Sequence, residues 1–274
     1  MSLIGVHIKH IDDIVNVRKY YKNINLIQIF VSAMTNYNDE KYKHVLKYIK
    51  IKKIKIVVHS SYSINLSKRW DETSWWIQQF IKEIECSNQL GALGIVIHIG
   101  KQLEMTISEA LNNMYTSLLY VHYKTRTLQK IKIIIETSSG QGTEILTQIQ
   151  ELCKFMKKIY THPDENVRNR FGICIDSCHV FAAGNDIRTK QDMKIFFRYI
   201  HRSIGIDKIK LCHINDSKKG LGKNVDRHMN IGEGYLGKDT LRRIIKFMKK
   251  LIIPIVLETP ELLIREDYKF LKNI

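Results

Sequence analysis

Six short apolar runs of this chain each end in a residue that can bind a metal ion. Three of these residues are histidines and three are carboxylates: His59, His98, Glu136, Asp176, His213 and Glu258. Imidazole and carboxylate groups without cysteine are typical ligands of catalytic zinc or manganese. Three carboxylates gathered in one place would repel one another unless cations neutralised them. The residue types therefore predict a metal centre if the fold brings the six together, although any one of them alone could simply cap a helix.

Two short motifs add three further candidate ligands. His179 follows Asp176 by three residues in DSCH, and Asp226 and His228 are two residues apart in DRH. Alternate residues of an extended loop point to the same side, so this second pair can reach one ion. The nine candidates suffice for three ions if one carboxylate bridges two of them. Three divalent ions against four carboxylates leave a surplus of about two positive charges, which suits phosphodiester hydrolysis better than chemistry on a neutral sugar.

Eight apolar segments rich in isoleucine and valine are the predicted strands that position these residues. Nearly continuous apolar character is typical of parallel strands buried on both faces. The six residues recur at intervals of 37 to 45 residues, which is the length of one strand, one helix and two loops. We therefore predict an α/β fold, a single (β/α)8 TIM barrel over residues 1–274, whose carboxyl-terminal rim collects the strand ends. The predicted strands are 3–8, 26–31, 54–58, 93–97, 131–135, 171–175, 208–212 and 252–257.

Segments between the strands show a helical period. Residues 73–90 carry one apolar stripe, and Gly91 is well placed to end that helix. In residues 239–250, apolar positions alternate at helical spacing with basic ones. Most basic residues of such helices are expected to face solvent.

The net charge of +17 favours a polyanionic partner such as DNA or RNA. The alternative explanation is a compositional bias, because Ile, Lys and Asn are abundant together. A true binding face should be built from loops that follow strands. Of the basic residues in such loops, Arg227 is the strongest candidate; the others are Lys68, Arg69, Lys218, Lys219 and Lys223.

No segment predicts a membrane or secretory destination. The N-terminal residues are interrupted by His7, Lys9 and His10, and no run approaches the roughly 18 apolar residues that span a bilayer. The five cysteines include no C-x-x-C pair and are expected to be reduced and buried. We predict a soluble intracellular monomer of the cytoplasm or nucleus, or of the host cytoplasm or virion if the genome is viral.

The segments around the candidate ligands resemble the endonuclease IV family, the metal-dependent apurinic/apyrimidinic (AP) endonucleases of base excision repair. The resemblance runs from about residue 4 to 260. It is carried by HSSYSIN (59–65), IVIHIG (95–100), IETSSGQG (135–142), GICIDSCHVFAAGNDIRT (172–189), HINDSKKGLGKNVDRHMNIGEG (213–234) and PIVLET (254–259). It implies hydrolysis of double-stranded DNA 5′ to an abasic site, leaving a 3′-hydroxyl and a 5′-deoxyribose phosphate. Trimming of blocked 3′ ends stays open.

The resemblance also implies three divalent ions, with Zn²⁺ preferred over Mn²⁺, and a division of the ligands among them. One ion is held by His59, His98 and Glu136. Glu136 bridges to a second ion, which is held also by Asp176, His213 and Glu258. The third ion is held by His179, Asp226 and His228. The residues expected to be catalytic are Glu136, Glu258 and His179.

The implied DNA contacts lie in loops at the same rim. Tyr62 and Asn65 match the family's loop after the third strand, which enters the minor groove. The loop after the second strand, VSAMTNY (31–37), departs from the family's basic, tryptophan-containing loop. Met34 or Tyr37 is expected to fill the gap left by the flipped nucleotide, because apolar side chains can wedge between base steps.

Two alternatives stay open at this stage. A sugar isomerase or epimerase would use one or two metals at a similar barrel rim, but it would not need His179, Asp226 and His228 as a third cluster. A non-catalytic damage-binding protein would keep the fold and the charge, but it would not need every metal ligand.

Overall fold

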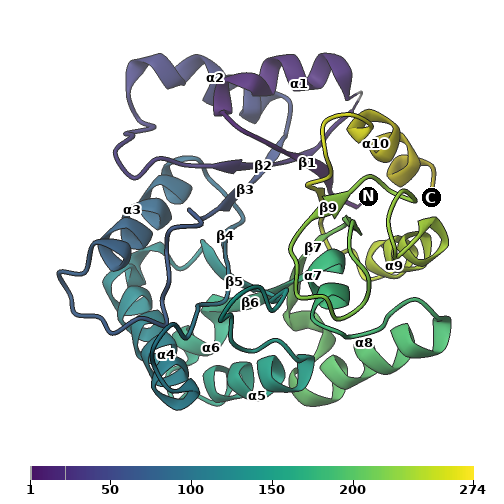
Figure 1. The fold of residues 1–274 in the computed structure, drawn as a ribbon. Coiled ribbons are helices and arrows are strands. Elements are labelled where there is room, and N and C mark those ends of the chain that lie inside the picture. The colour runs from purple at the N-terminus through teal and green to yellow at the C-terminus, as the bar shows by residue number, and fades with distance from the viewer. Residues whose placement is uncertain (1, 22) are drawn as a thin grey trace.

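Eight parallel strands close into a barrel in the order β1-β10-β7-β6-β5-β4-β3-β2 (Figure 1). The structure, a computed structural model, describes residues 2–21 and 23–274. The predicted TIM barrel is confirmed, and each predicted strand is present within three residues of its expected ends. The strands are β1 (Ile4–Ile8), β2 (Leu26–Phe30), β3 (Lys55–His59), β4 (Gly94–Ile97), β5 (Lys132–Glu136), β6 (Phe171–Asp176), β7 (Ile209–His213) and β10 (Ile255–Leu257).

Helices surround the barrel, as the view along its axis in Figure 1 shows. They are α1 (Ile14–Tyr20), α2 (Glu40–Ile51), α3 (Trp75–Gln89), α4 (Ile107–Lys124), α5 (Ile149–Tyr160), α6 (Glu165–Arg170), α7 (Ser177–Ala182), α8 (Lys190–Ile204), α9 (Lys238–Lys250) and α10 (Ile264–Asn273). The helices predicted over 73–90 and 239–250 are α3 and α9. Gly91 follows the end of α3 with a φ of +63°, a conformation that glycine adopts without steric cost. Within the described residues, no helix is both long and apolar enough to cross a membrane.

The last predicted strand begins three residues later than expected. β10 starts at Ile255, and just before it the Pro254 carbonyl accepts the backbone N–H of Cys212 in β7 at 2.9 Å. Ile252 has a φ of +58°, and Pro254 has no backbone N–H to donate to a neighbouring strand. The apolar run in the sequence therefore begins three residues before the segment that pairs as a strand of the barrel.

Apolar layers cover both faces of the barrel, which explains the nearly continuous apolar strands. The outer layer packs the strands against the helices and forms the main core. The inner layer is a separate cluster inside the barrel, formed by Leu26, Val57, Val96, Ile134, Cys174, Leu211 and Val256. Each of seven strands contributes one residue to this inner layer.

The next inward-facing position along each of these strands is polar. Residues two apart on a strand lie on the same face, so a ring of polar side chains sits directly above the apolar layer. This polar ring consists of Gln28, His59, His98, Glu136, Asp176, His213 and Glu258. Strand β1 contributes His7 to it, with Gly5 below, where an added Cβ would lie 2.1 Å from the Leu26 carbonyl oxygen.

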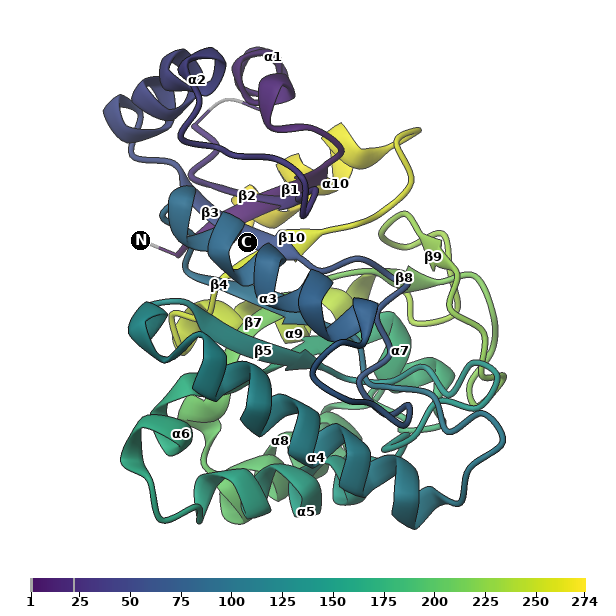
Figure 2. The same ribbon diagram turned by 90° about the vertical axis from the view of Figure 1, so that its left-hand side faces the viewer.

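The loops that follow the strands gather at one end of the barrel, opposite the N-terminus (Figure 2). This mouth carries α7 and a short antiparallel pair, β8 (Asp216–Ser217) and β9 (His228–Met229). Asp216 is buried and accepts the backbone N–H groups of Gly232 and Leu236, both at 2.9 Å. These bonds fold the long loop between β7 and α9 back over the mouth, above the polar ring.

Candidate metal centre

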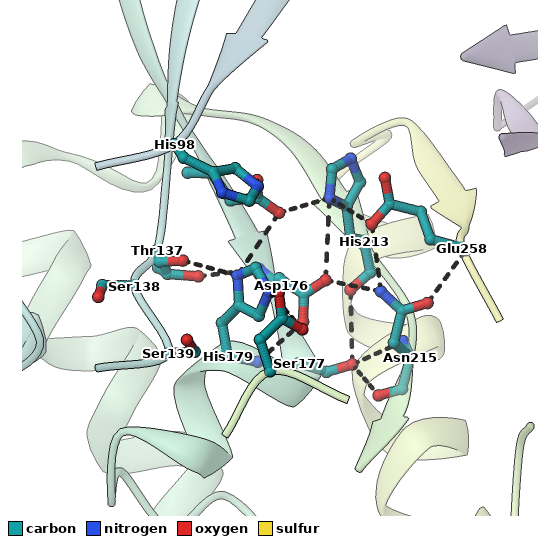
Figure 3. Close-up of polar contacts among 12 residues, drawn as sticks. His98, Thr137, Ser138, Ser139, Asp176, Ser177, His179, His213, Asn215 and Glu258 are labelled. Carbon is teal, nitrogen blue, oxygen red and sulfur yellow. Dashed lines mark hydrogen bonds and ion pairs between the residues drawn. The ribbon is translucent and has the colours of Figure 1, made fainter. Parts of the chain in front are cut away.

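The nine predicted ligands converge at the mouth of the barrel. They form three groups, and within each group the ligand atoms lie within 4.8 Å of one another. In Figure 3, histidines and carboxylates from separate strands point toward one another. The groups are His59, His98 and Glu136; Glu136, Asp176, His213 and Glu258; and His179, Asp226 and His228. Glu136 is shared by the first two groups.

Glu136 turns one carboxylate oxygen toward each of these two groups. Its Oε2 atom is 3.0 Å from Nε2 of His98 and 3.4 Å from Nε2 of His59. Its Oε1 atom is 2.6 Å from Nδ1 of His213. The side chain is completely buried at the end of β5. A carboxylate placed in this way can bridge two cations, with one oxygen on each.

Asp176 and Glu258 bring the other carboxylates of the second group. Nδ1 of His213 lies 3.2 Å from Oε2 of Glu258 and 3.8 Å from Oδ2 of Asp176. The Asn215 amide donates to the same two oxygens, at 3.4 Å and 2.6 Å respectively. The second Asp176 oxygen caps α7 by accepting the backbone N–H of His179 at 2.9 Å. This cap places His179 beside the strand-end residues.

The third group combines α7 with the loop that crosses the mouth. Nε2 of His179 and Nε2 of His228 lie 3.2 Å and 3.3 Å from Oδ1 of Asp226. The backbone N–H of Asp226 donates to the side-chain oxygen of Gln141 at 3.1 Å. The Gln141 contact and the β8–β9 pairing therefore hold Asp226 and His228 over His179.

Four of the five imidazoles have one ring nitrogen bonded to a backbone or amide oxygen. Nδ1 donates to a backbone carbonyl in three of them: from His59 to Ser60 (2.8 Å), from His179 to Thr137 (2.9 Å) and from His228 to Glu258 (3.3 Å). In the fourth, Nε2 of His213 donates to the side-chain oxygen of Gln28 (2.8 Å). These oxygens can only accept, so each donor nitrogen carries a hydrogen. The opposite ring nitrogen then keeps its lone pair for a cation.

The distances between the donor atoms suit divalent transition-metal ions. Ligands that share a tetrahedral ion at about 2.0–2.1 Å lie roughly 3.3 Å from each other. Separations of 3.0 to 3.4 Å occur in the first and third groups. Nε2 of His179 and of His228 are also buried without a hydrogen-bond partner among the described residues. Buried polar atoms are normally satisfied, so two orphaned nitrogens facing one carboxylate oxygen fit a shared cation.

The charges of the centre support the same interpretation. Burial disfavours the ionised form of Glu136, yet the imidazoles of His213 and His98 outweigh it and hold the pKa of Glu136 well below its ordinary value. Burial likewise opposes the charge of His213, but Glu258 and Glu136 raise its pKa to about 9. The nearby carboxylates also raise the pKa values of His179 and His228 against the effect of burial, so without cations protons on these three imidazoles balance the carboxylates. Divalent ions can replace those protons, so metal binding is expected to release them.

Two buried cysteines lie beside the centre without the character of ligands. Cys174 and Cys178 each come within ligand range of carboxylates and histidines. Burial raises the pKa of Cys178 to about 12 and that of Cys174 well above its ordinary value. Cys174 belongs to the apolar layer below the polar ring, and both side chains are completely buried, so we interpret both as small buried groups, in line with the buried, reduced cysteines expected from the sequence.

Tyr62 and Met34 stand at the mouth with their side chains in solvent. Tyr62 is 67% exposed, and its ring lies 5.1 Å from that of His98 and 5.2 Å from that of Phe30. Met34 is 97% exposed. A hollow of about 480 Å³ has both side chains in its lining. The two are therefore free to meet a partner next to the metal ligands.

Three other predicted DNA contacts differ in their surroundings. Tyr37 is only 5% exposed and packs against Tyr42, with ring centres 4.9 Å apart, so it cannot reach DNA from this position. The Asn65 side-chain amide donates to the Lys101 carbonyl at 2.9 Å and accepts the Lys101 backbone N–H at 3.0 Å. These two hydrogen bonds join the loops after β3 and β4. Arg227 is exposed between two predicted ligands.

Sequence reasoning missed several residues that hold the ligands, namely Gln28, Asn215 and Gln141. Gln28 carried a local signal, because it is a lone polar residue inside the apolar run LIQIF. An amide at an inward-facing strand position requires buried partners. Asn215 and Gln141 lie in loops, where polar residues are common and local patterns do not reveal their partners.

The sequence of this chain is similar to one family model and to proteins from several organisms. The family model described as a xylose isomerase-like TIM barrel matches residues 23–274. The putative endonuclease 4 of Acanthamoeba polyphaga mimivirus is 35% identical over 275 residues, covering 94% of this chain and 85% of the relative. The probable endonuclease 4 of Buchnera aphidicola subsp. Acyrthosiphon pisum is 36% identical over 214 residues, covering 77% and 73%.

Solved structures share the fold at lower identity. Endonuclease IV from Thermus thermophilus superimposes with a TM-score of 0.77 at 20% identity, covering 99% of both chains. A D-tagatose 3-epimerase-like protein gives a TM-score of 0.74, also at 20% identity, covering 100% of this chain and 95% of that one. At this identity, the likeness concerns the barrel alone.

Proposed function

This chain belongs to the endonuclease IV family, and from that premise we propose that it hydrolyses the DNA backbone 5′ to an abasic site. It is a hydrolase of the endonuclease IV type. The products of this cleavage are a 3′-hydroxyl and a 5′-deoxyribose phosphate. Removal of blocking groups from 3′ ends is a second hydrolysis of the same bond type and is included in the test below.

The observation that carries the proposal is the third ligand group beside the Glu136 bridge. His179, Asp226 and His228 come from α7 and the loop after β7, outside the ring of strand-end residues. A sugar isomerase or epimerase needs only one or two ions at the barrel rim. Three sites next to one another suit a phosphodiester, whose attacking and leaving oxygens and non-bridging oxygens all need stabilisation.

We assign three divalent ions to the three groups, with zinc favoured by the imidazole and carboxylate ligands. When bound, such ions supply Lewis acidity, which activates water near neutral pH and stabilises a leaving oxygen. The protein holds four of the five imidazoles in one tautomer through the ring nitrogens bonded to backbone or amide oxygens. Glu136 separates the first two groups by the width of one carboxylate, and Asp226 orients the third group toward the same side of the mouth.

The DNA contacts we propose come from the loops of the mouth. Tyr62 enters the duplex next to the first group, and Met34 fills the space of the flipped nucleotide. Arg227 contacts the backbone near the third group. Tyr37 supports the loop of Met34 from the core, and Asn65 positions the loop of Tyr62, so neither is proposed to touch DNA. The net charge of +17 attracts the duplex over a longer range. The protein is further proposed to act as a soluble, single-domain monomer.

One assay tests class and substrate together. Duplexes with a synthetic abasic site, with no damage and with a blocked 3′ end are incubated with zinc-loaded protein, with and without a chelator. The expected result is a single cut 5′ to the abasic site that the chelator abolishes and added zinc restores. An intact abasic duplex in the presence of zinc would overturn the proposal. Metal analysis near one or two ions per chain would favour the isomerase class instead.

A further inference from the structure

Gln28 belongs to the polar ring without being one of its six predicted metal ligands. With the β1 residue His7, the ring has eight positions, and His7 and Gln28 are neighbours in it, because β1 and β2 pair and these two residues are partners in register. Gln28 is completely buried, with 0% of its surface exposed. A buried amide in an otherwise apolar strand costs stability unless it serves other groups.

We propose that Gln28 is a positioning residue for the metal centre, one that selects the metal-binding tautomer of His213 and turns Glu258 toward the second ligand group. The inference rests on the proposed function, because it concerns the same centre. It adds a residue that touches no ion and no DNA but acts through two ligands at once.

The first contact fixes His213. Nε2 of His213 lies 2.8 Å from Oε1 of Gln28. An amide oxygen only accepts, so Nε2 must carry the hydrogen, and the lone pair of the neutral ring stays on Nδ1. Nδ1 is the atom that faces Oε1 of Glu136 at 2.6 Å and Oε2 of Glu258 at 3.2 Å. The contact therefore reserves for a cation the nitrogen that points into the second group.

The second contact fixes Glu258 and the direction of the amide itself. Nε2 of Gln28 donates to Oε1 of Glu258 at 2.5 Å and to Nδ1 of His7 at 2.9 Å. The two amide hydrogens thus have one acceptor each. If the amide were turned over, its oxygen would face the Glu258 carboxylate, which also only accepts. Glu258 and His7 together keep Oε1 of Gln28 toward His213, and Oε2 of Glu258 is turned into the second group, 3.2 Å from Nδ1 of His213.

Among the described residues, no other side chain contacts both Nε2 of His213 and Oε1 of Glu258. The Asn215 amide reaches the opposite oxygen of Glu258, at 3.4 Å, and makes no contact with His213 Nε2. Loss of the Gln28 amide would leave Nε2 of His213 without its partner, and Oε1 of Glu258 would keep Nδ1 of His7 at 3.6 Å in place of the amide at 2.5 Å. Residues that orient metal ligands in this way typically change metal affinity by roughly 10- to 100-fold when they are replaced.

The test compares Gln28→Met, which keeps the length of the side chain but removes the amide, with Gln148→Met. Gln148 is exposed, donates its amide to the Ala183 carbonyl at 2.8 Å and contacts no predicted ligand, so it is the control for loss of an amide outside the centre. Ions per chain are counted after dialysis, zinc affinity is measured by competition with a chromogenic chelator, and kcat and KM are determined on an abasic duplex. Melting of the metal-free proteins reports on folding.

For Gln28→Met we expect about 10- to 100-fold weaker binding of one ion, a fall in kcat that excess zinc partly restores, and KM within about twofold of the wild type. Gln148→Met should match the wild type in all three. Wild-type zinc affinity in Gln28→Met would overturn the inference. The inference would also be overturned if metal-free Gln28→Met melted far below metal-free wild type and the zinc-loaded variant lost all its ions, because Gln28 would then be a general packing residue. Gln28→Leu repeats the comparison with a different apolar shape. If wild-type protein itself binds no zinc or cuts no abasic DNA, the proposed function fails instead.

Discussion

Glu136 is the residue on which the two deepest ligand groups meet. Glu136→Gln keeps the size of the side chain but replaces one ligand oxygen by an amide nitrogen that cannot bind a cation. We expect kcat on an abasic duplex to fall by about a thousandfold, equivalent to about 4 kcal/mol, and two ions to become easier to remove by dialysis. The measurement is a steady-state cleavage assay combined with metal analysis. Glu104→Gln on the surface is the control, and near-normal rates in Glu136→Gln would remove the bridging assignment.

Met34 is the most exposed large apolar side chain at the mouth, at 97%. If Met34 fills the gap left by the flipped nucleotide, its contacts offset the free-energy cost of taking that nucleotide out of the base stack. Met34→Ala removes these contacts and should therefore lower kcat/KM on an abasic duplex by about tenfold. On a single-stranded abasic oligonucleotide, which has no stack to open, the change should be less than about twofold. Ile51→Ala on α2, 62% exposed, is a control of similar polarity. Equal losses on both substrates would contradict the wedge.

At the scale of the elements, α3 supports the loop that follows β3 through one buried carboxyl group. Glu83 is 0% exposed and accepts the backbone N–H of Ser61 at 3.2 Å and the amide of Gln79 at 2.9 Å. Ser61 lies two residues beyond His59 and directly precedes Tyr62. A helix that packs on the outside of the barrel thereby helps to shape both the first ligand group and its neighbouring DNA contact.

The carboxyl group of Glu83 should also make stability depend on pH. Burial raises its pKa from 4.5 to about 7, against the opposing bonds from Gln79 and Ser61. The folded protein therefore binds this proton more tightly than the unfolded chain does, and the stability that this residue contributes is complete below about pH 4.5 and lost as the pH rises to 7. Across that window the loss is on the order of 3 kcal/mol.

Glu83→Gln should remove that slope. In urea titrations with a chelator present, the difference in unfolding free energy between variant and wild type should shift in favour of the variant by roughly 3 kcal/mol from about pH 4.5 to about pH 7.5. Other titrating groups cancel in this difference. Glu85→Gln on the same helix tests whether loss of any carboxylate has the effect. A difference that is constant across the window would show that Glu83 is ionised in the folded protein at all these values of pH.

At the scale of the whole molecule, the centre joins most of the barrel, because its ligands come from six strands and the segments that follow them. Metal removal should therefore lower the melting temperature. An ion present at about 100 times its Kd stabilises the folded state by about 2.7 kcal/mol, which corresponds to at least about 5 °C in a chain of this size. The measurement is circular dichroism melting before and after chelation and after zinc is returned. Identical melts would mean that no ion is bound in the folded protein.

The positive charge of the whole molecule acts on DNA regardless of damage. Arg227→Ala should weaken binding to abasic and intact duplexes by similar factors and reduce the slope of log K against log salt by about 0.9. Lys250→Ala, at the end of α9, is the control for a basic residue on an outer helix. Fluorescence anisotropy at several salt concentrations measures both slopes. Loss of abasic binding alone would assign Arg227 to lesion recognition instead of backbone contact.

The sequence by itself determined the barrel and the places of its candidate ligands. A nearly continuous apolar run that ends in a histidine or a carboxylate is a local property, so these runs already predicted buried parallel strands with candidate ligands at their ends. The regular spacing of strands and helices then required a closed parallel sheet with these ends at one rim. The chemical types of the side chains predicted cations there.

Only the tertiary structure decided which side chains support the ligands and which reach solvent. Gln28 contacts His213 across 185 residues of chain and Glu258 across 230, since β2, β7 and the end of β10 all turn these side chains into the inside of the closed barrel. Met34 and Tyr37 lie in the same short loop and are both apolar, yet Met34 is 97% exposed and Tyr37 only 5%. The packing of that loop on Tyr42 and Gln89 separates them. Contacts of this kind depend on how distant segments meet in three dimensions, which no local pattern encodes.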